Sequence, residues 1–360
     1  MGNKLISGIA AVVLTVWGGG AMAQSSPSAG EILQAWLASP HADSTSEAFR
    51  HWDSEGEIPG TCAVCHSTTG LVDYLASPME TPGIIDHPVP LGTTVECAAC
   101  HDAAAQSLTD VLFPSGVTIS ATGTSNVCRV CHQGRSSSDQ VEAAVSGIDD
   151  DAVSAELGFI NVHYSAAAAT QLGGAVRGGY QYAGREYAGP FQHVAGLDNC
   201  VSCHGGHDTS VQIESCTTCH QGATEFESIR TTALDVLGRG ESTAGISTVV
   251  DELHARLGAA IAAYSQEVIG TAVAYSDAAY PYFFIDTDGN GIAEPGEAIF
   301  PNRYQSWTPR LLRAAYNYQF VAKDHGAFAH NPHYVMQLMF DSLADLSQVA
   351  TVDMTGLTRP

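Results

Sequence analysis

The feature that most constrains this chain is a five-residue pattern, Cys-x-x-Cys-His, which occurs five times. The copies begin at Cys62, Cys97, Cys128, Cys200 and Cys216. They use all ten cysteines of the chain, two in each copy. The pattern is the attachment signal for c-type haem, in which two thiols bond to the porphyrin and the histidine binds iron. The sequence therefore predicts five covalently bound haems.

We number the copies motif 1 to motif 5 in chain order. The cysteines predicted to hold the haems are Cys62, Cys65, Cys97, Cys100, Cys128, Cys131, Cys200, Cys203, Cys216 and Cys219. The histidines predicted to bind iron on the proximal side are His66, His101, His132, His204 and His220.

Cys-x-x-Cys pairs also occur in zinc sites and in thioredoxin-type redox centres. A zinc site usually joins two such pairs around one metal, and five pairs cannot be divided evenly in that way. A disulfide framework would need no histidine after each pair. Covalent haem is the preferred interpretation, and zinc or redox-active thiols are the alternatives.

Residues 1–23 have the pattern of a secretory signal. Lys4 precedes an apolar run at residues 5–17, and Ala21-Met-Ala23 is a small-residue cleavage site. The run is shorter than the ~20 residues that span a bilayer, which favours a cleaved signal over a membrane anchor. No later segment is long and apolar enough to span. We expect an exported protein, periplasmic or extracellular, without a membrane span after cleavage.

The chain is strongly acidic, with 38 aspartates and glutamates against 14 lysines and arginines, a formal net charge of −24. Lys323 is the only lysine after the signal. So few cations cannot form the basic surface that nucleic acid requires, so nucleic acid is excluded as a partner. The acidity suits a soluble exported chain, and it would also suit docking to a basic partner or a cationic mineral surface.

Composition divides the chain into a cysteine-containing region at residues 24–225, the predicted five-haem domain, and a helical region at 226–360. We expect a mainly α, loop-rich fold in which the haems form the core. A short helix is predicted at 29–38, a polar surface excursion at 133–157 and a helical run at 161–172. The aromatic clusters of 173–191 predict a small β-hairpin with its turn near Gly184.

Three helices are predicted after residue 226. The first has an apolar stripe at helical spacing, made of Val250, Leu253, Leu257, Ile261, Tyr264 and Val268. The second begins at Thr308-Pro309 and the third at Asn331-Pro332, each with a capping residue followed by proline. The third helix is predicted to bury Val335, Leu338, Met339, Leu343 and Leu346.

Residues 286–297 match the EF-hand loop pattern, with oxygen ligands at positions 1, 3 and 5, glycine at 6 and glutamate at 12. Position 7 would offer its backbone carbonyl. The predicted calcium ligands are Asp286, Asp288, Asn290, Ile292, Glu294 and Glu297. Because the loop is single and follows an extended segment, it is interpreted as a structural clip rather than a switch. An acidic turn without metal is the alternative.

Each haem iron needs a second axial ligand unless the position is left open for catalysis. Fifteen histidines less the five in the motifs leave ten, twice the number required. His207 follows motif 4 so closely that it is expected to serve a neighbouring haem, and His330 directly precedes a capped helix. The distal ligands predicted are His41, His163, His193, His207 and His330, with His51 as the reserve for His41. The remaining histidines, at 87, 254, 325 and 333, are interpreted as bystanders.

These residues carry a resemblance to bacterial multihaem, and in particular pentahaem, cytochromes c. Trp36-x-x-Ser39-x-His41-Ala42 and His330-Asn331-Pro332-x-Tyr334 are similar to distal-histidine segments of the hydroxylamine oxidoreductase and pentahaem nitrite reductase superfamily. Cys200-x-x-Cys203-His204-x-x-His207 resembles the doubled-motif cytochromes of metal-respiring and sulfate-reducing bacteria. The reductases keep one haem open, often with a proximal lysine, and this chain contains no Cys-x-x-Cys-Lys.

These observations predict an electron carrier rather than an enzyme, because two histidines on every iron leave no position for a substrate. The absence of a methionine ligand implies low potentials. The expected role is electron transfer in anaerobic or extracellular respiration, with other redox proteins, multihaem cytochromes or an extracellular acceptor as partners. The alternatives are a reductase or oxidase of a small nitrogen or sulfur compound at one open haem, and a subunit of an extracellular cytochrome filament or other homo-oligomer.

Overall fold

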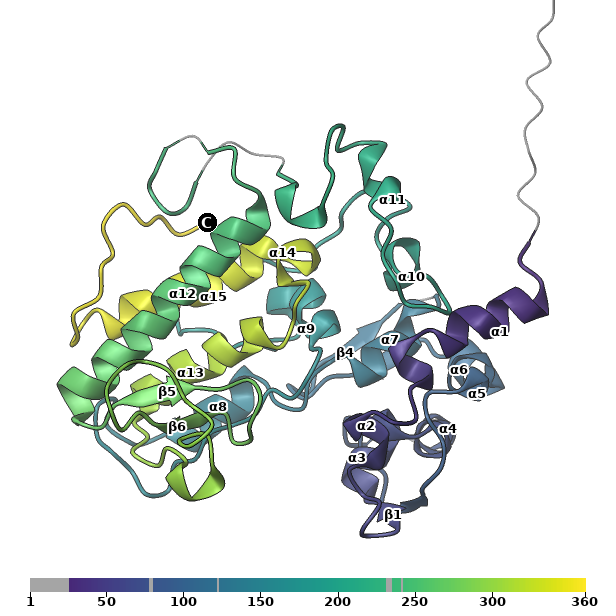
Figure 1. Ribbon diagram of the computed structural model, residues 1–360, viewed down its shortest axis with the longest axis horizontal. Helices are drawn as coiled ribbons and strands as arrows, with labels where there is room; N and C mark the ends of the chain where they lie inside the picture. The colour runs from purple at the N-terminus through teal and green to yellow at the C-terminus, as the bar shows by residue number, and fades with distance from the viewer. Residues whose placement is uncertain (1–25, 78–79, 122, 231–234, 241) are drawn as a thin grey trace, which may run out of the picture.

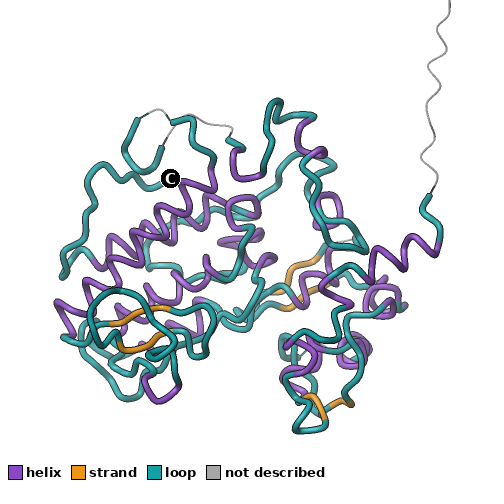
Figure 2. The backbone as a smooth tube through the Cα atoms, viewed as in Figure 1, coloured by secondary structure: helices purple, strands orange, loops and turns teal. Residues whose placement is uncertain are grey.

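A computed structural model describes residues 26–77, 80–121, 123–230, 235–240 and 242–360. The predicted signal at residues 1–23 lies outside these ranges. Short helices and long loops make up most of the chain, and the long helices lie near the C-terminus (Figures 1 and 2). Within the described residues, no helix combines the length and the apolar character needed to cross a bilayer.

The first part of the chain holds short elements: α1 (Ala29–Leu37), α2 (Glu47–Arg50), β1 (Glu57–Ile58), α3 (Gly60–His66), α4 (Thr68–Ala76), β2 (Val89–Pro90), α5 (Cys97–His101), α6 (Ala103–Gln106), β3 (Asp110–Leu112), β4 (Thr118–Ser120) and α7 (Ser125–Cys131). The middle part holds α8 (Ser138–Val145), α9 (Ala167–Leu172), α10 (Cys200–Cys203) and α11 (Glu214–Thr217). The last part holds α12 (Ile246–Tyr264), β5 (Val273–Tyr275), β6 (Phe283–Ile285), α13 (Pro309–Ala322), α14 (Ala327–His330) and α15 (Pro332–Leu346).

The three long helices, α12, α13 and α15, pack against one another at one end of the molecule (Figure 1). The predicted caps are confirmed: Thr308 Oγ1 accepts from the N–H of Leu311 at 3.2 Å, and Asn331 Oδ1 accepts from the N–H of Tyr334 at 3.1 Å. The predicted apolar stripes of α12 and α15 face this bundle, and all five residues named for α15 are buried. Capping and burial together therefore fix where α15 begins and how it is turned.

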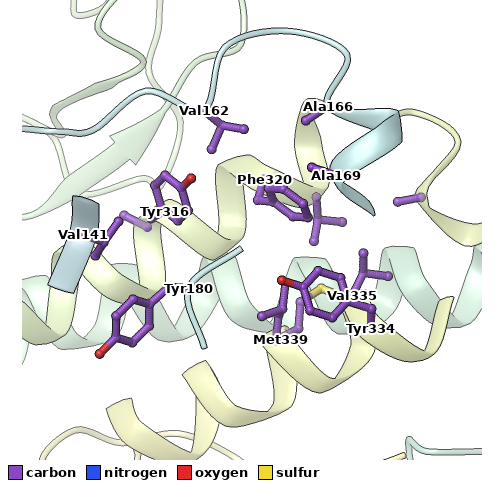
Figure 3. Packing of buried hydrophobic residues seen from close by; sticks show 14 of the residues in the cluster. Val141, Val162, Ala166, Ala169, Tyr180, Tyr316, Phe320, Tyr334, Val335 and Met339 are labelled. Carbon is purple, nitrogen blue, oxygen red and sulfur yellow. The ribbon is translucent and has the colours of Figure 1, made fainter. Parts of the chain in front are cut away.

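The hydrophobic core continues from this bundle into the haem-motif region. Figure 3 shows Phe320 of α13 pointing toward Ala169 of α9, with Tyr334 and Val335 of α15 on its other side. The same cluster of buried residues includes Val64 in motif 1 and reaches Leu346. The proposed division at residues 225 and 226 stays a prediction, and this core lies on both sides of it.

The predicted β-hairpin at 173–191 is wrong. The antiparallel strand pairs in the described residues are β1–β2, β3–β4 and β5–β6, and none lies in that segment. Its backbone instead bonds to side chains of the C-terminal helices: Gly179 N–H to Tyr334 Oη at 3.1 Å, Tyr180 N–H to Asn317 Oδ1 at 2.7 Å and Ala188 N–H to Gln337 Oε1 at 2.8 Å. These side chains satisfy the groups that a partner strand would have used.

Two further expectations change. The helical run predicted from residue 161 begins only at α9, because His163 and Ser165 have φ of 73° and 54°, which a helix cannot contain. The segment 133–157 is not a simple surface excursion. It forms α8, whose Val141 and Val145 are buried, and α8 packs on α13. The prediction missed this amphipathic helix because most residues of the segment are polar.

Candidate haem sites

Each haem motif lies in or at the end of a short helix, α3, α5, α7, α10 and α11 for motifs 1 to 5. Residues three and four apart on a helix lie on the same face. In motifs 1 and 2, which lie wholly within α3 and α5, the two thiols and the histidine therefore lie on one side of the helix. This is the local geometry that covalent attachment and iron ligation together require.

Each motif histidine faces one further histidine, and the five partners are those predicted as distal ligands. The distances between ring centroids are 5.8 Å for His66 and His163, 6.1 Å for His101 and His207, 6.4 Å for His132 and His41, 6.3 Å for His204 and His330, and 5.8 Å for His220 and His193. Four of the partners lie 91 to 126 residues away in sequence, and His193 lies 27 residues before His220, so the tertiary fold makes most of these pairs.

The separations fit one metal ion between each pair. An imidazole nitrogen lies about 2.0–2.1 Å from a bound metal and about 1.1 Å from its own ring centre, so two opposed imidazoles have centroids about 6.3 Å apart. The five observed values lie between 5.8 and 6.4 Å. The residues present therefore fit a six-coordinate haem iron at each pair.

Hydrogen bonds fix the second ring nitrogen of several site histidines. His66 Nδ1 lies 2.7 Å from the carbonyl oxygen of Ala48, His132 Nδ1 3.0 Å from that of Ser165, and His204 Nδ1 2.9 Å from that of Thr209. An Nδ1–H group that donates to a carbonyl leaves Nε2 deprotonated and free to bind metal. Backbone carbonyls carry no sequence signal, so these supporting groups could not have been predicted.

His330 has a different support, because its Nδ1 lies 2.8 and 2.9 Å from the two oxygens of Asp324. Asp324 is buried and also accepts from the N–H of Gly326 at 3.1 Å. Gly326 is needed here, since a Cβ at this position would lie 2.6 Å from His330 Cε1. The only sequence signal for this arrangement was an aspartate six residues before a histidine.

Burial favours the neutral form of four site histidines, which is the form that binds a metal. Burial lowers the pKa of His41, His66 and His132, and it lowers that of His163 to about 4 with a further contribution from His66. At His330, burial acts in the same direction, but the charge and hydrogen bond of Asp324 outweigh it and raise the pKa.

The other histidines have different contacts. His51, the reserve for His41, lies 2.8 Å from Glu47 and stacks edge-on against Trp52 rather than facing a motif histidine. His87 pairs with Asp86, and His254 stacks on a tyrosine ring. The structure thus places His41, and not His51, opposite a motif histidine.

Two curated proteins of Geobacter sulfurreducens are similar to this chain. The c-type polyheme cytochrome OmcC is 30% identical over 361 residues, which cover 84% of this chain and 44% of that protein. The c-type polyheme cytochrome OmcB is 27% identical over 358 residues, which cover 84% of this chain and 46% of that protein. The chain belongs to the multihaem c-type cytochromes. This multihaem cytochrome spans less than half the length of those relatives.

No family model matches the multihaem cytochrome, and no solved structure does. The likeness to the hydroxylamine oxidoreductase and pentahaem nitrite reductase superfamily therefore stays a resemblance in two short segments.

The multihaem cytochrome also contains the predicted calcium loop, which follows strand β6. Candidate ligand oxygens of Asp286, Asp288 and Glu297 all lie within 4.8 Å of one another. Glu297 Oε2 is buried without a hydrogen-bond partner. Asn290 and Glu294 bond to each other at 2.6 Å. An unpaired buried carboxylate oxygen beside two other carboxylates is the donor set that Ca²⁺ prefers, so the loop fits this ion.

The remaining member of the predicted calcium set is Ile292, whose N–H donates to Asn290 Oδ1 at 2.8 Å. The six predicted ligands thus separate into three carboxylates that converge and three residues that make contacts within the loop. Positions 1, 3 and 12 of the EF-hand pattern are the converging ones. The preceding segment is the strand β6 and not a helix, so the loop lacks the paired helices of a complete EF-hand.

Proposed function

We propose that this chain carries electrons through five covalently bound haems, each with two histidine ligands. The observation that carries the proposal is the pairing of every motif histidine with one other histidine at 5.8 to 6.4 Å. Such a pair would supply two imidazole ligands to one haem iron. An iron without an open position can exchange electrons but cannot bind a substrate.

The haem, when bound, supplies one-electron redox chemistry, and the chain supplies binding, orientation and electrostatics. The ten cysteine thiols would anchor the porphyrins, and the ten paired imidazoles would hold the irons. The carbonyls of Ala48, Ser165 and Thr209 fix the ring orientation at three proximal histidines. The haem-facing side chains are therefore held in place before an electron arrives, which keeps structural change on redox cycling small.

The setting of the proposed function is export and exchange with other redox proteins. The signal pattern at residues 1–23 supports a periplasmic or extracellular location. The names of both relatives describe polyheme c-type cytochromes, which supports other redox proteins, multihaem cytochromes or an extracellular acceptor as partners. The net charge of −24 favours partners with a basic docking surface.

The test is the haem content and spin state of the purified cytochrome. Because thioether bonds survive denaturation, the denatured chain should keep the mass of five haems, and its ferric EPR spectrum should contain low-spin signals only. Four or fewer haems in fully matured material would contradict the stoichiometry. A high-spin ferric signal in the unmodified protein would instead favour a reductase or oxidase with one open iron.

A pair of variants tests the ligand assignment. His330→Ala should open one iron, which then gives a high-spin signal and binds carbon monoxide when reduced. His333→Ala, an exposed neighbour three residues further on, should leave every iron low-spin. The assignment of His330 fails if the two variants give the reverse result or if both remain low-spin with five haems.

We further propose that the loop at 286–297 binds one calcium ion as a structural clip, with Asp286, Asp288 and Glu297 as its carboxylate ligands. Ca²⁺–oxygen distances are about 2.3–2.6 Å, so ligand oxygens around one ion lie up to about 5 Å apart. The 4.8 Å limit observed for these three residues supports the assignment.

A further inference from the structure

Motif 3 makes direct contact with two motifs that are far from it in sequence. Its helix α7 touches α3, which carries motif 1, and α10, which carries motif 4. Cys131 Sγ lies 3.9 Å from the carbonyl oxygen of Val64, inside motif 1. On the other side, the N–H of Cys200 donates to Ser125 Oγ at 3.0 Å. Motif 3 therefore lies between motif 1 and motif 4.

Haem-binding cysteines take part in both contacts. The Cys131 thiol of motif 3 lies against the backbone of motif 1, and the backbone of Cys200 in motif 4 bonds to the first residue of α7. One thiol of motif 3 thus faces motif 1, and the beginning of its helix faces motif 4. Since each thiol would bond to the edge of its own porphyrin, motifs in contact would bring their porphyrin edges close together.

A single loop joins the same three sites through their histidines. It supplies His163, which faces the motif 1 histidine, and the carbonyl of Ser165, which accepts from His132, the proximal histidine of motif 3. The N–H of Ser165 donates to the carbonyl of Lys323 at 2.9 Å, next to Asp324, which holds the distal histidine of motif 4. The proximal side of the motif 3 site is therefore built jointly with motifs 1 and 4.

Motif 2 is attached to this arrangement in a different way. Its distal histidine, His207, comes from the segment just after motif 4, and the N–H of Val95, just before motif 2, donates to the carbonyl of His41 at 3.1 Å. Cys97 and Cys100 are both exposed, unlike the thiols of motif 3. Motif 2 therefore lies beside the line from motif 1 to motif 4.

We propose that the haem site of motif 3 is the junction of the network, through which electrons pass between motif 1 and motif 4 without using motif 2. The order of electron transfer is thus not the order of the motifs in the chain. This inference rests on the proposed five-haem function. Electron tunnelling slows steeply as the distance between cofactor edges grows, so the contacts of motif 3 with motifs 1 and 4 mark the fast steps.

Two double variants test this order in the haem-loaded protein. The double variant His163→Ala/His41→Ala removes the distal ligands of the haems held by motifs 1 and 3 (sites 1 and 3). The double variant His163→Ala/His207→Ala removes those of the haems held by motifs 1 and 2 (sites 1 and 2). Two high-spin irons couple through their magnetic dipoles, with a strength that falls as the cube of their separation. The high-spin EPR signal of the first variant should fall clearly below the sum of its two single variants, and that of the second should stay closer to its sum.

Equal or stronger coupling in the second variant would overturn the proposal. Haem content and the single-variant spectra check the proposed function separately, because a single variant that stays low-spin contradicts a ligand and not the order. If a variant fails to load five haems, a structure of the unmodified haem-loaded protein decides the matter. The proposal is supported if the iron–iron distance between sites 1 and 3 is shorter than that between sites 1 and 2. It is contradicted if the distance between sites 1 and 2 is the shorter one.

Discussion

Asp324→Asn is expected to raise the reduction potential of one haem in five. Among the described residues, Asp324 is the one carboxylate hydrogen-bonded to a paired histidine, with both oxygens within 2.9 Å of His330 Nδ1. A negative charge on the far side of a ligand stabilises the more positive ferric iron, so it lowers the potential. Asparagine keeps the size and can still accept the hydrogen bond, but it removes the charge.

Two estimates give the size of the effect. A hydrogen bond to a charged group is worth about 1 kcal/mol more than a neutral one, which is about 40 mV for a one-electron couple. A carboxylate oxygen bonded to Nδ1 lies about 7 Å from a metal on Nε2, and a unit charge at that distance contributes about 2.4 kcal/mol at an effective dielectric constant of ~20. That energy corresponds to about 100 mV. We expect a rise of about 40–100 mV.

The assay is a potentiometric titration of the haem-loaded protein followed by its absorption spectrum. One component out of five should move to higher potential, and Asp324→Glu should return it toward the original value. Asp341→Asn is the control, because Asp341 is equally buried but its carboxylate bonds to Arg359 and to no histidine. A titration of Asp324→Asn that superimposes on that of the unmodified protein would refute this electrostatic role.

Three further changes have defined outcomes. Gly326→Ala should displace the His330 ring and give a high-spin iron, since the added Cβ would lie 2.6 Å from it, whereas Gly158→Ala enters open space and should change no iron. Chelation of calcium should lower the melting temperature of the haem-loaded protein with little change in its spectrum, because saturation at ~100 times Kd is worth about 2.7 kcal/mol; Glu297→Gln should abolish that response. Asn331→Ala should destabilise the protein by about 1–2 kcal/mol in urea unfolding through loss of the α15 cap.

Each of these outcomes can fail in a recognisable way. A Gly326→Ala protein with only low-spin irons would show that the ring can move without losing its metal. Equal melting curves in chelator and in excess calcium would contradict the proposal that the loop at 286–297 binds calcium. An unfolding free energy unchanged in Asn331→Ala would mean that the packing of α15, and not its cap, determines where the helix begins.

The haem chemistry could be predicted from the sequence, because covalent attachment needs thiols and an imidazole at a fixed local spacing. The same holds for the starts of α13 and α15, where a capping side chain and proline act within one helical turn. The five partner histidines were also predicted, mostly from helix starts and the neighbourhood of a motif. These are all local signals, since each depends on residues within about one turn of one another.

The tertiary structure alone decided which histidine faces which motif, since the partners of motifs 1 to 4 come from segments far away in the chain. It also decided the contact of motif 3 with motifs 1 and 4, which no spacing in the sequence encodes. The segment at 173–191 shows the physical reason most plainly. Its aromatic pattern predicted a hairpin, but side chains of α13 and α15 satisfy its backbone, and those side chains reach it only once the chain has folded.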